Sequence, residues 1–186
     1  MMEKYIIFLI FLSSCIVRKI GGGDEFVLKP QKNSILSLNF NLNGAYVCPV
    51  KVDDNLSSYI VWFLYTNGVT RSYFCNIRKP VAQINDITIV NSIMQEIMID
   101  SQFKTGGGFE INDNDFKLQE FQIGHYGIYD LWTYSGTVVS DSNLKIYSIK
   151  KEKNSAITKS LFFKLIQMPK PDSTNQWMNK NWYWAK

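Results

Sequence analysis

Few residues in this chain of 186 could do chemistry: three cysteines, one histidine and a scatter of carboxylates. The histidine, His125, lies in the stretch GHYG, where the flanking glycines could expose it in a loop as a general base. No Gly-x-Ser-x-Gly motif offers a nucleophile, and neither Cys48 nor Cys75 sits in a catalytic signature. We therefore predict no catalytic residue and no enzyme activity, with a hydrolase that uses His125 as the least favoured alternative.

Metal binding and paired-carboxylate chemistry have equally little support. The sequence contains neither a CxxC motif nor a second histidine, which excludes a structural zinc site. The run Asn112-Asp113-Asn114 could begin a calcium loop, but the glycine and glutamate that such a loop needs further on are missing, so we predict a turn. Glu110, Glu120 and Asp130 could pair as acid and base, yet carboxylates on strands usually lie on a solvated face. We expect neither a metal nor a cofactor.

The third cysteine, Cys15, follows the stretch MMEKYIIFLIFLSS. Lys4 precedes an apolar run that starts at Tyr5, a pattern typical of a secretory signal. Even extended to Val17 the run has about 13 residues, whereas a helix needs about 20 to cross a bilayer. A permanent transmembrane anchor is therefore not expected.

The end of this run, Leu12-Ser13-Ser14-Cys15, resembles the lipobox of bacterial lipoproteins. The resemblance implies that residues 1–14 are a signal peptide and that Cys15 becomes the N-terminus and carries acyl chains such as palmitate. Several chains give stable membrane attachment. The alternative is an ordinary cleaved signal peptide in which Cys15 has no role.

The residue after the cysteine bears on localisation. Ile16 stands where an aspartate would resemble an inner-membrane retention signal, so the resemblance favours the outer membrane of the bacterial cell envelope, with the periplasmic or surface face left open. Residues 15–34, which include three consecutive glycines from Gly21, are predicted to form a lipidated, flexible spacer. Residues 35–186 are predicted to form a single β-rich domain.

Composition agrees with one domain and gives little indication of a charged partner. Hydrophobic residues make up 46% of the chain, enough for a sizeable core. The net charge is +4, with 20 basic and 16 acidic residues and no basic stripe. We expect no nucleic-acid partner.

Without Cys15, two cysteines remain, an even number in an oxidising compartment. A disulfide between Cys48 and Cys75 would close a loop of about 28 residues and stabilise the domain by about 3.5 kcal/mol. The alternative is two buried free thiols, since each cysteine lies in a predicted strand. The sequence leaves both open.

Alternation with a period of two predicts strands through most of the domain. A hairpin with a type I′ turn is predicted, with the run YIVWFLY as its first strand, Asn67-Gly68 as its turn and residues 70–77 as its second strand. Residues 132–147 and 109–123 predict two more hairpins. Apolar residues at helical spacing predict an amphipathic helix over about 86–102, with Asp86 as its N-cap and its apolar stripe packed on the sheet. Gly106–Gly108 would cap this helix and lead into the next strand.

These elements predict a mainly β fold: an antiparallel up-and-down barrel or strongly bent sheet with one inserted amphipathic helix. The start Asn43-Gly44-Ala45-Tyr46 and the up-and-down run of strands that follows it resemble the lipocalin-like small lipoproteins of the bacterial outer membrane, many of them uncharacterised. The resemblance spans roughly residues 36–168 and lies in the strand pattern. Tyr46 stands where that family has Trp, and the helix interrupts the barrel instead of following it.

The sequence favours a noncatalytic role, in which the protein binds a small apolar or amphipathic ligand or an envelope partner. A barrel mouth would bury the ligand. The residues predicted to line it are Tyr59, Trp62, Trp132 and Tyr134. A structural envelope component with a filled core is the alternative. The aromatic C-terminus, from Trp177 to Trp184, is predicted to plug one end of the barrel, with an exposed aromatic platform as the alternative.

Overall fold

The computed structural model describes residues 28, 40–52, 56–79, 84–99, 106–123, 129–151 and 156–173. Cys15, the predicted signal and most of the predicted spacer lie outside the described residues. His125 and the aromatic C-terminus also lie outside them.

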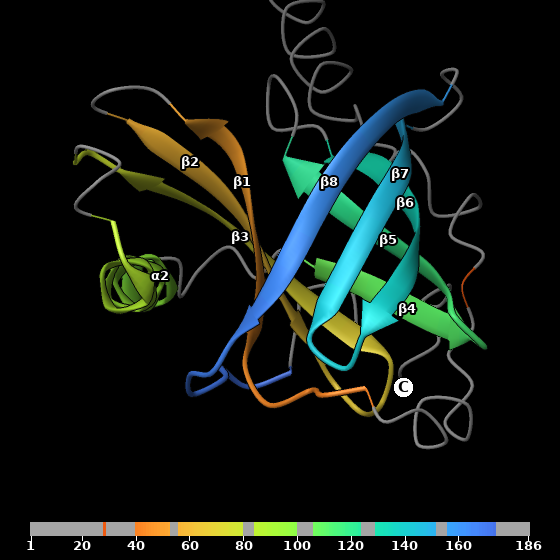
Figure 1. Ribbon diagram of the computed structural model, residues 1–186, viewed down its shortest axis with the longest axis horizontal. Coiled ribbons are helices and arrows are strands. Elements are labelled where there is room, and N and C mark those ends of the chain that lie inside the picture. Colours follow the sequence, from red (N-terminus) through yellow and green to blue (C-terminus); the bar gives the residue numbers. More distant parts are fainter. Residues whose placement is uncertain are drawn as a thin grey trace, which may run out of the picture.

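Eight antiparallel strands form a closed barrel in which each strand pairs with its neighbours in sequence and the last pairs with the first (Figure 1). The strands are β1 (Ala45–Val52), β2 (Ser57–Leu64), β3 (Val69–Ile77), β4 (Gly106–Asn112), β5 (Asp115–Ile123), β6 (Tyr129–Ser140), β7 (Asn143–Lys151) and β8 (Ile157–Ile166). The helix α2 (Asp86–Ile99) is inserted between β3 and β4. The predicted mainly β, up-and-down barrel with an inserted helix is confirmed.

The start of α2 differs by one residue from the prediction. The side chain of Asn85, not Asp86, caps the helix, because Asn85 Oδ1 accepts hydrogen bonds from the Thr88 backbone N–H (2.9 Å) and from Thr88 Oγ1 (3.0 Å). The predicted end at 102 lies outside the described residues, in which α2 ends at Ile99.

The predicted hairpins form, but the β2–β3 turn is not type I′. A type I′ turn needs two residues with positive φ. In this turn Gly68 has a φ of +77°, whereas Asn67 is not in the left-handed region. Gly68 N–H donates to Tyr65 O (2.8 Å) and Tyr65 N–H to Val69 O (3.0 Å). This pattern matches a three-residue loop that ends in a left-handed glycine.

The triple glycine belongs to β4 itself, not to a helix cap. Gly106 pairs with Arg71 of β3 on one side and with Phe121 of β5 on the other. A Cβ atom on Gly107 would lie 1.8 Å from the backbone oxygen of Gln119. β4 and β5 therefore approach each other too closely here for a side chain at Gly107.

Apolar side chains form two clusters on opposite sides of the barrel wall. The interior cluster receives residues from seven of the eight strands, including Trp62 and Phe163, and fills the barrel. The outer cluster lies between α2 and the outward faces of β1, β2 and β3, and includes Ile89 and Ile93 of the helix. The predicted packing of the helix on the sheet is therefore confirmed, although Met98, placed in the predicted stripe, is exposed.

The two cysteines lie on opposite sides of this wall. Cys48 belongs to the interior cluster and Cys75 to the outer one, and both thiols are free. Of the two alternatives that the sequence leaves open, the structure contains two buried free thiols and no Cys48–Cys75 disulfide. Burial raises the pKa of each thiol to about 11.

We expect neither Cys48 nor Cys75 in the folded protein to react with iodoacetamide at pH 8, because about one thiol in a thousand is then ionised and both are buried. After unfolding in guanidinium without reductant, both should be alkylated. Mass spectrometry of tryptic peptides measures this. A Cys48–Cys75 cross-linked peptide would contradict the structure.

One end of the barrel is closed by the segment before β1. The Phe40 ring stacks on Tyr46, with 5.0 Å between ring centroids, and the Tyr46 hydroxyl donates to the backbone oxygen of Asn41 (2.8 Å). The segment after β8 is tied to the same end, because Lys170 Nζ donates to the backbone oxygens of Leu42 (2.7 Å) and Leu64 (2.9 Å).

At the opposite end, which we call the open end, the wall parts. β1 pairs with β8 over Ala45–Val47, and the described part of β4 pairs with β3 over Val69–Arg71. Beyond these residues β1, β2 and β3 continue as a three-stranded sheet that diverges from β4–β8 (Figure 1). In the described part of the chain, no helix is long and apolar enough to span a membrane.

Candidate functional site

A buried group of polar side chains lies inside the barrel. Glu120 of β5 is fully buried and accepts hydrogen bonds from Ser72 Oγ and from Gln122 Nε2 (2.5 Å). The Tyr134 hydroxyl also hydrogen-bonds Glu120 and accepts from Gln122 Nε2 (3.0 Å). We call Ser72, Glu120, Gln122 and Tyr134 the polar layer.

Strand alternation places the polar layer in the interior. Phe116 and Leu118 of β5 belong to the interior cluster, so Glu120, two residues further, points the same way. Glu120 pairs with Gly107, which has no side chain to stand between β5 and β3. This explains how Ser72 of β3 can reach a carboxylate two strands away.

Burial dominates the electrostatics of the polar layer. Desolvation raises the pKa of Glu120, and the hydrogen bonds from Ser72, Gln122 and Tyr134 oppose the shift. The indole N–H of Trp62 also opposes it, although it does not reach hydrogen-bonding geometry with an acceptor in the described residues. Desolvation likewise raises the pKa of Tyr134, and the charge of Glu120 raises it further.

We expect the raised pKa of Glu120 to make the protein less stable as the pH rises. The folded state holds this proton more tightly than the unfolded chain, where the pKa is about 4.3. The stabilisation is therefore complete below that value and lost as the pH rises through the folded pKa. Glu120→Gln should flatten the decline and raise the free energy of unfolding at pH 8.

Urea unfolding between pH 4 and pH 8 measures this effect. Glu110→Gln is the matched control, because strand alternation places Glu110 on the outer face of β4 and its replacement should leave the slope unchanged. Equal slopes in wild type and Glu120→Gln would contradict the prediction.

The interior face becomes exposed immediately beyond the polar layer. Phe74 follows Ser72 on the inward face of β3 and pairs with Ile60, which packs against the interior cluster. Phe74 is nevertheless 56% exposed. An aromatic ring that points inward along the barrel is therefore accessible to solvent at the open end.

Charged side chains lie on the other side of the open end. Lys151 Nζ forms an ion pair with Asp130 Oδ2 (2.7 Å) and lies 5.9 Å from the centre of the Trp132 ring. These residues come from the paired ends of β6 and β7. The open end thus combines aromatic surface with one ion pair at its rim.

Three of the four predicted ligand-binding residues face the interior. Trp62 and Tyr134 are buried there, with 5.0 Å between their ring centroids, and Trp132 packs partly against the same cluster. Tyr59 does not join them, because it points outward into the cluster under α2. The prediction for Tyr59 was therefore wrong.

Sequence reasoning missed the residues with the most unusual surroundings. Glu120 was assigned to a solvated strand face but is buried, and Ser72, Gln122 and Phe74 were not singled out. The alternation of Phe116 and Leu118 with polar residues does place Glu120 on the apolar face. That signal was present in the sequence.

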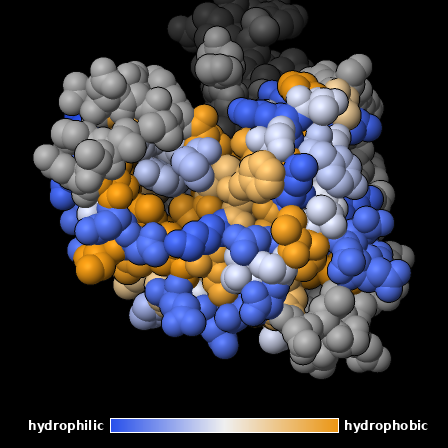
Figure 2. Space-filling model, in the orientation of Figure 1, coloured by the Kyte–Doolittle hydropathy of each residue, from blue (hydrophilic) through white to orange (hydrophobic). Residues whose placement is uncertain are grey.

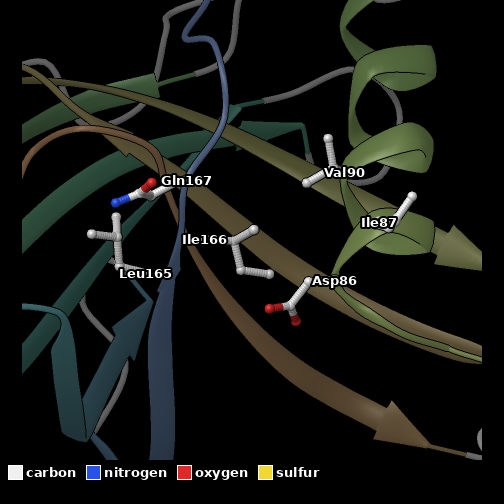
Figure 3. Close-up of a pocket in the computed structure, with 6 residues that line it drawn as sticks. All are labelled: Asp86, Ile87, Val90, Leu165, Ile166 and Gln167. Carbon is white, nitrogen blue, oxygen red and sulfur yellow. The ribbon is translucent and has the colours of Figure 1, made fainter.

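The outer surface of the barrel has a shallow depression beside α2 and an exposed phenylalanine on β8. A depression of about 490 Å³ lies between the first turn of α2 and the end of β8, lined by Ile87, Val90 and Ile166 among others, but it is outside the barrel and widely open (Figure 3).

Phe162 of β8 is 58% exposed on the outer face, with Lys145 Nζ 5.4 Å from its ring centre. On the face of the molecule shown in Figure 2, hydrophilic side chains interrupt the apolar surface.

The described residues contain no group of three or more His, Cys, Asp or Glu side chains placed to hold a metal ion. No protein-family model, curated protein or solved structure matches the chain.

Proposed function

We propose that the protein binds a small apolar or amphipathic ligand at the open end of the barrel. The observation that carries the proposal is Phe74, an interior-facing aromatic residue that is 56% exposed beside a buried polar layer. Ligand sites in proteins combine such apolar surface with a few fixed polar groups. Trp132 and Ile60, both partly buried against the interior cluster, would extend the contact.

A filled-core structural component of the envelope is the second candidate. Trp62 is packed among three other rings, with centroid distances of 4.0 Å to Phe163, 5.0 Å to Tyr134 and 6.0 Å to Phe116. This part of the interior leaves a ligand little room. The apolar part of the proposed site therefore lies beyond the ring cluster, toward Phe74.

The test compares two equally exposed phenylalanines on opposite faces of the wall. Full-length protein in phosphatidylcholine nanodiscs is titrated with the apolar fluorophore N-phenyl-1-naphthylamine, with empty nanodiscs as the blank. Phe74→Ser should weaken binding about tenfold to a hundredfold, because it removes roughly 1.5–3 kcal/mol of apolar contact. Phe162→Ser, at 58% exposure on the outer face, should leave it unchanged. Identical titrations for both variants and wild type would favour the structural component.

We further propose that Cys15 is lipidated and anchors the protein in the bacterial cell envelope, at the outer membrane. The support is the lipobox-like sequence Leu12-Ser13-Ser14-Cys15. Mass spectrometry of the mature N-terminus should find Cys15 as the first residue with acyl chains attached, and Cys15→Ser should release the protein from membranes. An unmodified N-terminus after cleavage elsewhere would overturn this proposal.

A further inference from the structure

Two buried hydrogen-bond donors beside the polar layer have no partner among the described residues. They are the indole Nε1 of Trp62 and the hydroxyl Oγ1 of Thr70. Both residues are fully buried. A buried donor without an acceptor costs about 1–3 kcal/mol, so such groups usually meet a water molecule or a ligand.

Strand register places both donors close to Glu120. Thr70 of β3 pairs with Gly107 of β4, which in turn pairs with Glu120 of β5. Because Gly107 has no side chain, none separates Thr70 from the carboxylate across these three paired positions. Trp62 pairs with Ser72, which donates to Glu120. The Glu120 carboxylate therefore accepts from three donors, on Ser72, Gln122 and Tyr134, and lies next to two more that reach hydrogen-bonding geometry with no acceptor in the described residues.

The chemistry of this arrangement discriminates between polar head groups. A carboxylate head would accept from Trp62 and Thr70 but would lie beside the Glu120 carboxyl group, and two carboxyl groups this close cannot both be ionised without a large cost. An ammonium head would pair with Glu120 but could accept nothing from Trp62. Lys151, which lies at the rim beside Trp132, already pairs with Asp130 and so is not available to neutralise an added charge. A hydroxyl or a primary amide both donates and accepts.

We propose that the ligand is a neutral amphipathic molecule, an alkyl chain with a hydroxyl or primary-amide head, that inserts head first into the polar layer. The head donates to Glu120 and accepts from Trp62 and Thr70, while the chain runs past Phe74 to the open end. This inference rests on the proposed function, because it assigns the polar group of that same site.

Three ligands with the same chain length test the head group. 1-Decanol, decanoate and decylammonium are titrated separately by calorimetry into full-length protein in phosphatidylcholine nanodiscs, with empty nanodiscs as blanks. We expect 1-decanol to bind at least about tenfold more tightly than either ion, the equivalent of one or two well-placed hydrogen bonds.

Matched variants locate the effect. Thr70→Val keeps the side-chain shape and removes the hydroxyl, and should weaken 1-decanol binding about fivefold to tenfold without changing decylammonium binding, because an ammonium accepts no hydrogen bond. Thr158→Val, at an exposed position on β8, is the control and should change neither. Trp62→Phe is a second variant that removes the other donor, and thermal unfolding verifies that each variant is folded.

The outcomes separate this inference from the proposed function. Equal binding of all three ligands, sensitive to Phe74→Ser, would retain the binding site and overturn the neutral head group. Preference for 1-decanol that survives both Thr70→Val and Trp62→Phe would assign the two donors to buried water and overturn the inference. Absence of binding by all three ligands would overturn both.

Discussion

Full-length protein carrying Gly107→Ala is expected to lose about 3 kcal/mol or more of its free energy of unfolding. The added Cβ would lie 1.8 Å from Gln119 O and 2.7 Å from Glu120 Cα. Both contacts are with backbone, so no rotation of a side chain can relieve them. β4 must move away from β5, which breaks ladder hydrogen bonds in the wall of the barrel.

The same shift would separate the strands that bring Ser72 to Glu120. Urea unfolding followed by circular dichroism measures the loss of stability, and Ser160→Ala, at an exposed position on β8, is the control with an expected change below about 0.5 kcal/mol. A Gly107→Ala protein as stable as the control would show that β4 and β5 do not approach as closely as the structure has them.

Trp62→Ala is expected to cost about 3–5 kcal/mol of stability, the range for removing a large buried aromatic side chain. Its ring stacks on Phe163 at a centroid distance of 4.0 Å and meets Tyr134 edge-on. Removing it leaves a cavity that rings held by three different strands cannot fill without distorting the barrel.

Trp132→Ala is the matched control, because the same side chain is there only partly buried. It should cost roughly half as much, in proportion to the apolar area it removes from water. Denaturant midpoints and unfolding rates measure both variants. Equal losses for Trp62→Ala and Trp132→Ala would contradict the central position assigned to Trp62.

Period-two alternation was sufficient to predict an antiparallel barrel or strongly bent sheet, but it could not assign faces in β2. The run YIVWFLY is apolar on both sides because its inward residues meet the barrel core and its outward residues meet α2. Alternation places Tyr59 and Trp62, three residues apart, on opposite faces, so only one of them can face the interior. Without knowing that the helix covers this strand, nothing in the sequence indicates which one. That is why one predicted ligand-binding residue was placed on the wrong side.

For Glu120 and the glycines of β4, the sequence could not predict contacts between strands. Alternation indicates that Glu120 lies on the apolar face of its strand. It does not indicate that Glu120 accepts a hydrogen bond from Ser72, which lies two strands away across Gly107 and 48 residues away in the sequence. A triple glycine after a helix is equally consistent with a cap and with a strand that lacks side chains. Only the register of β3, β4 and β5 decides between them.

The separation of the two thiols means that folding of the barrel domain does not depend on an oxidant. A strand wall lies between Cys48 and Cys75, so the native state can neither gain nor lose a bond between them when the redox potential of its surroundings changes. The domain can reach the same structure in a reducing or an oxidising compartment. Its stability instead rests on packing and strand register. Gly107 and Trp62 thus stabilise the fold, as disulfides do in many small exported domains.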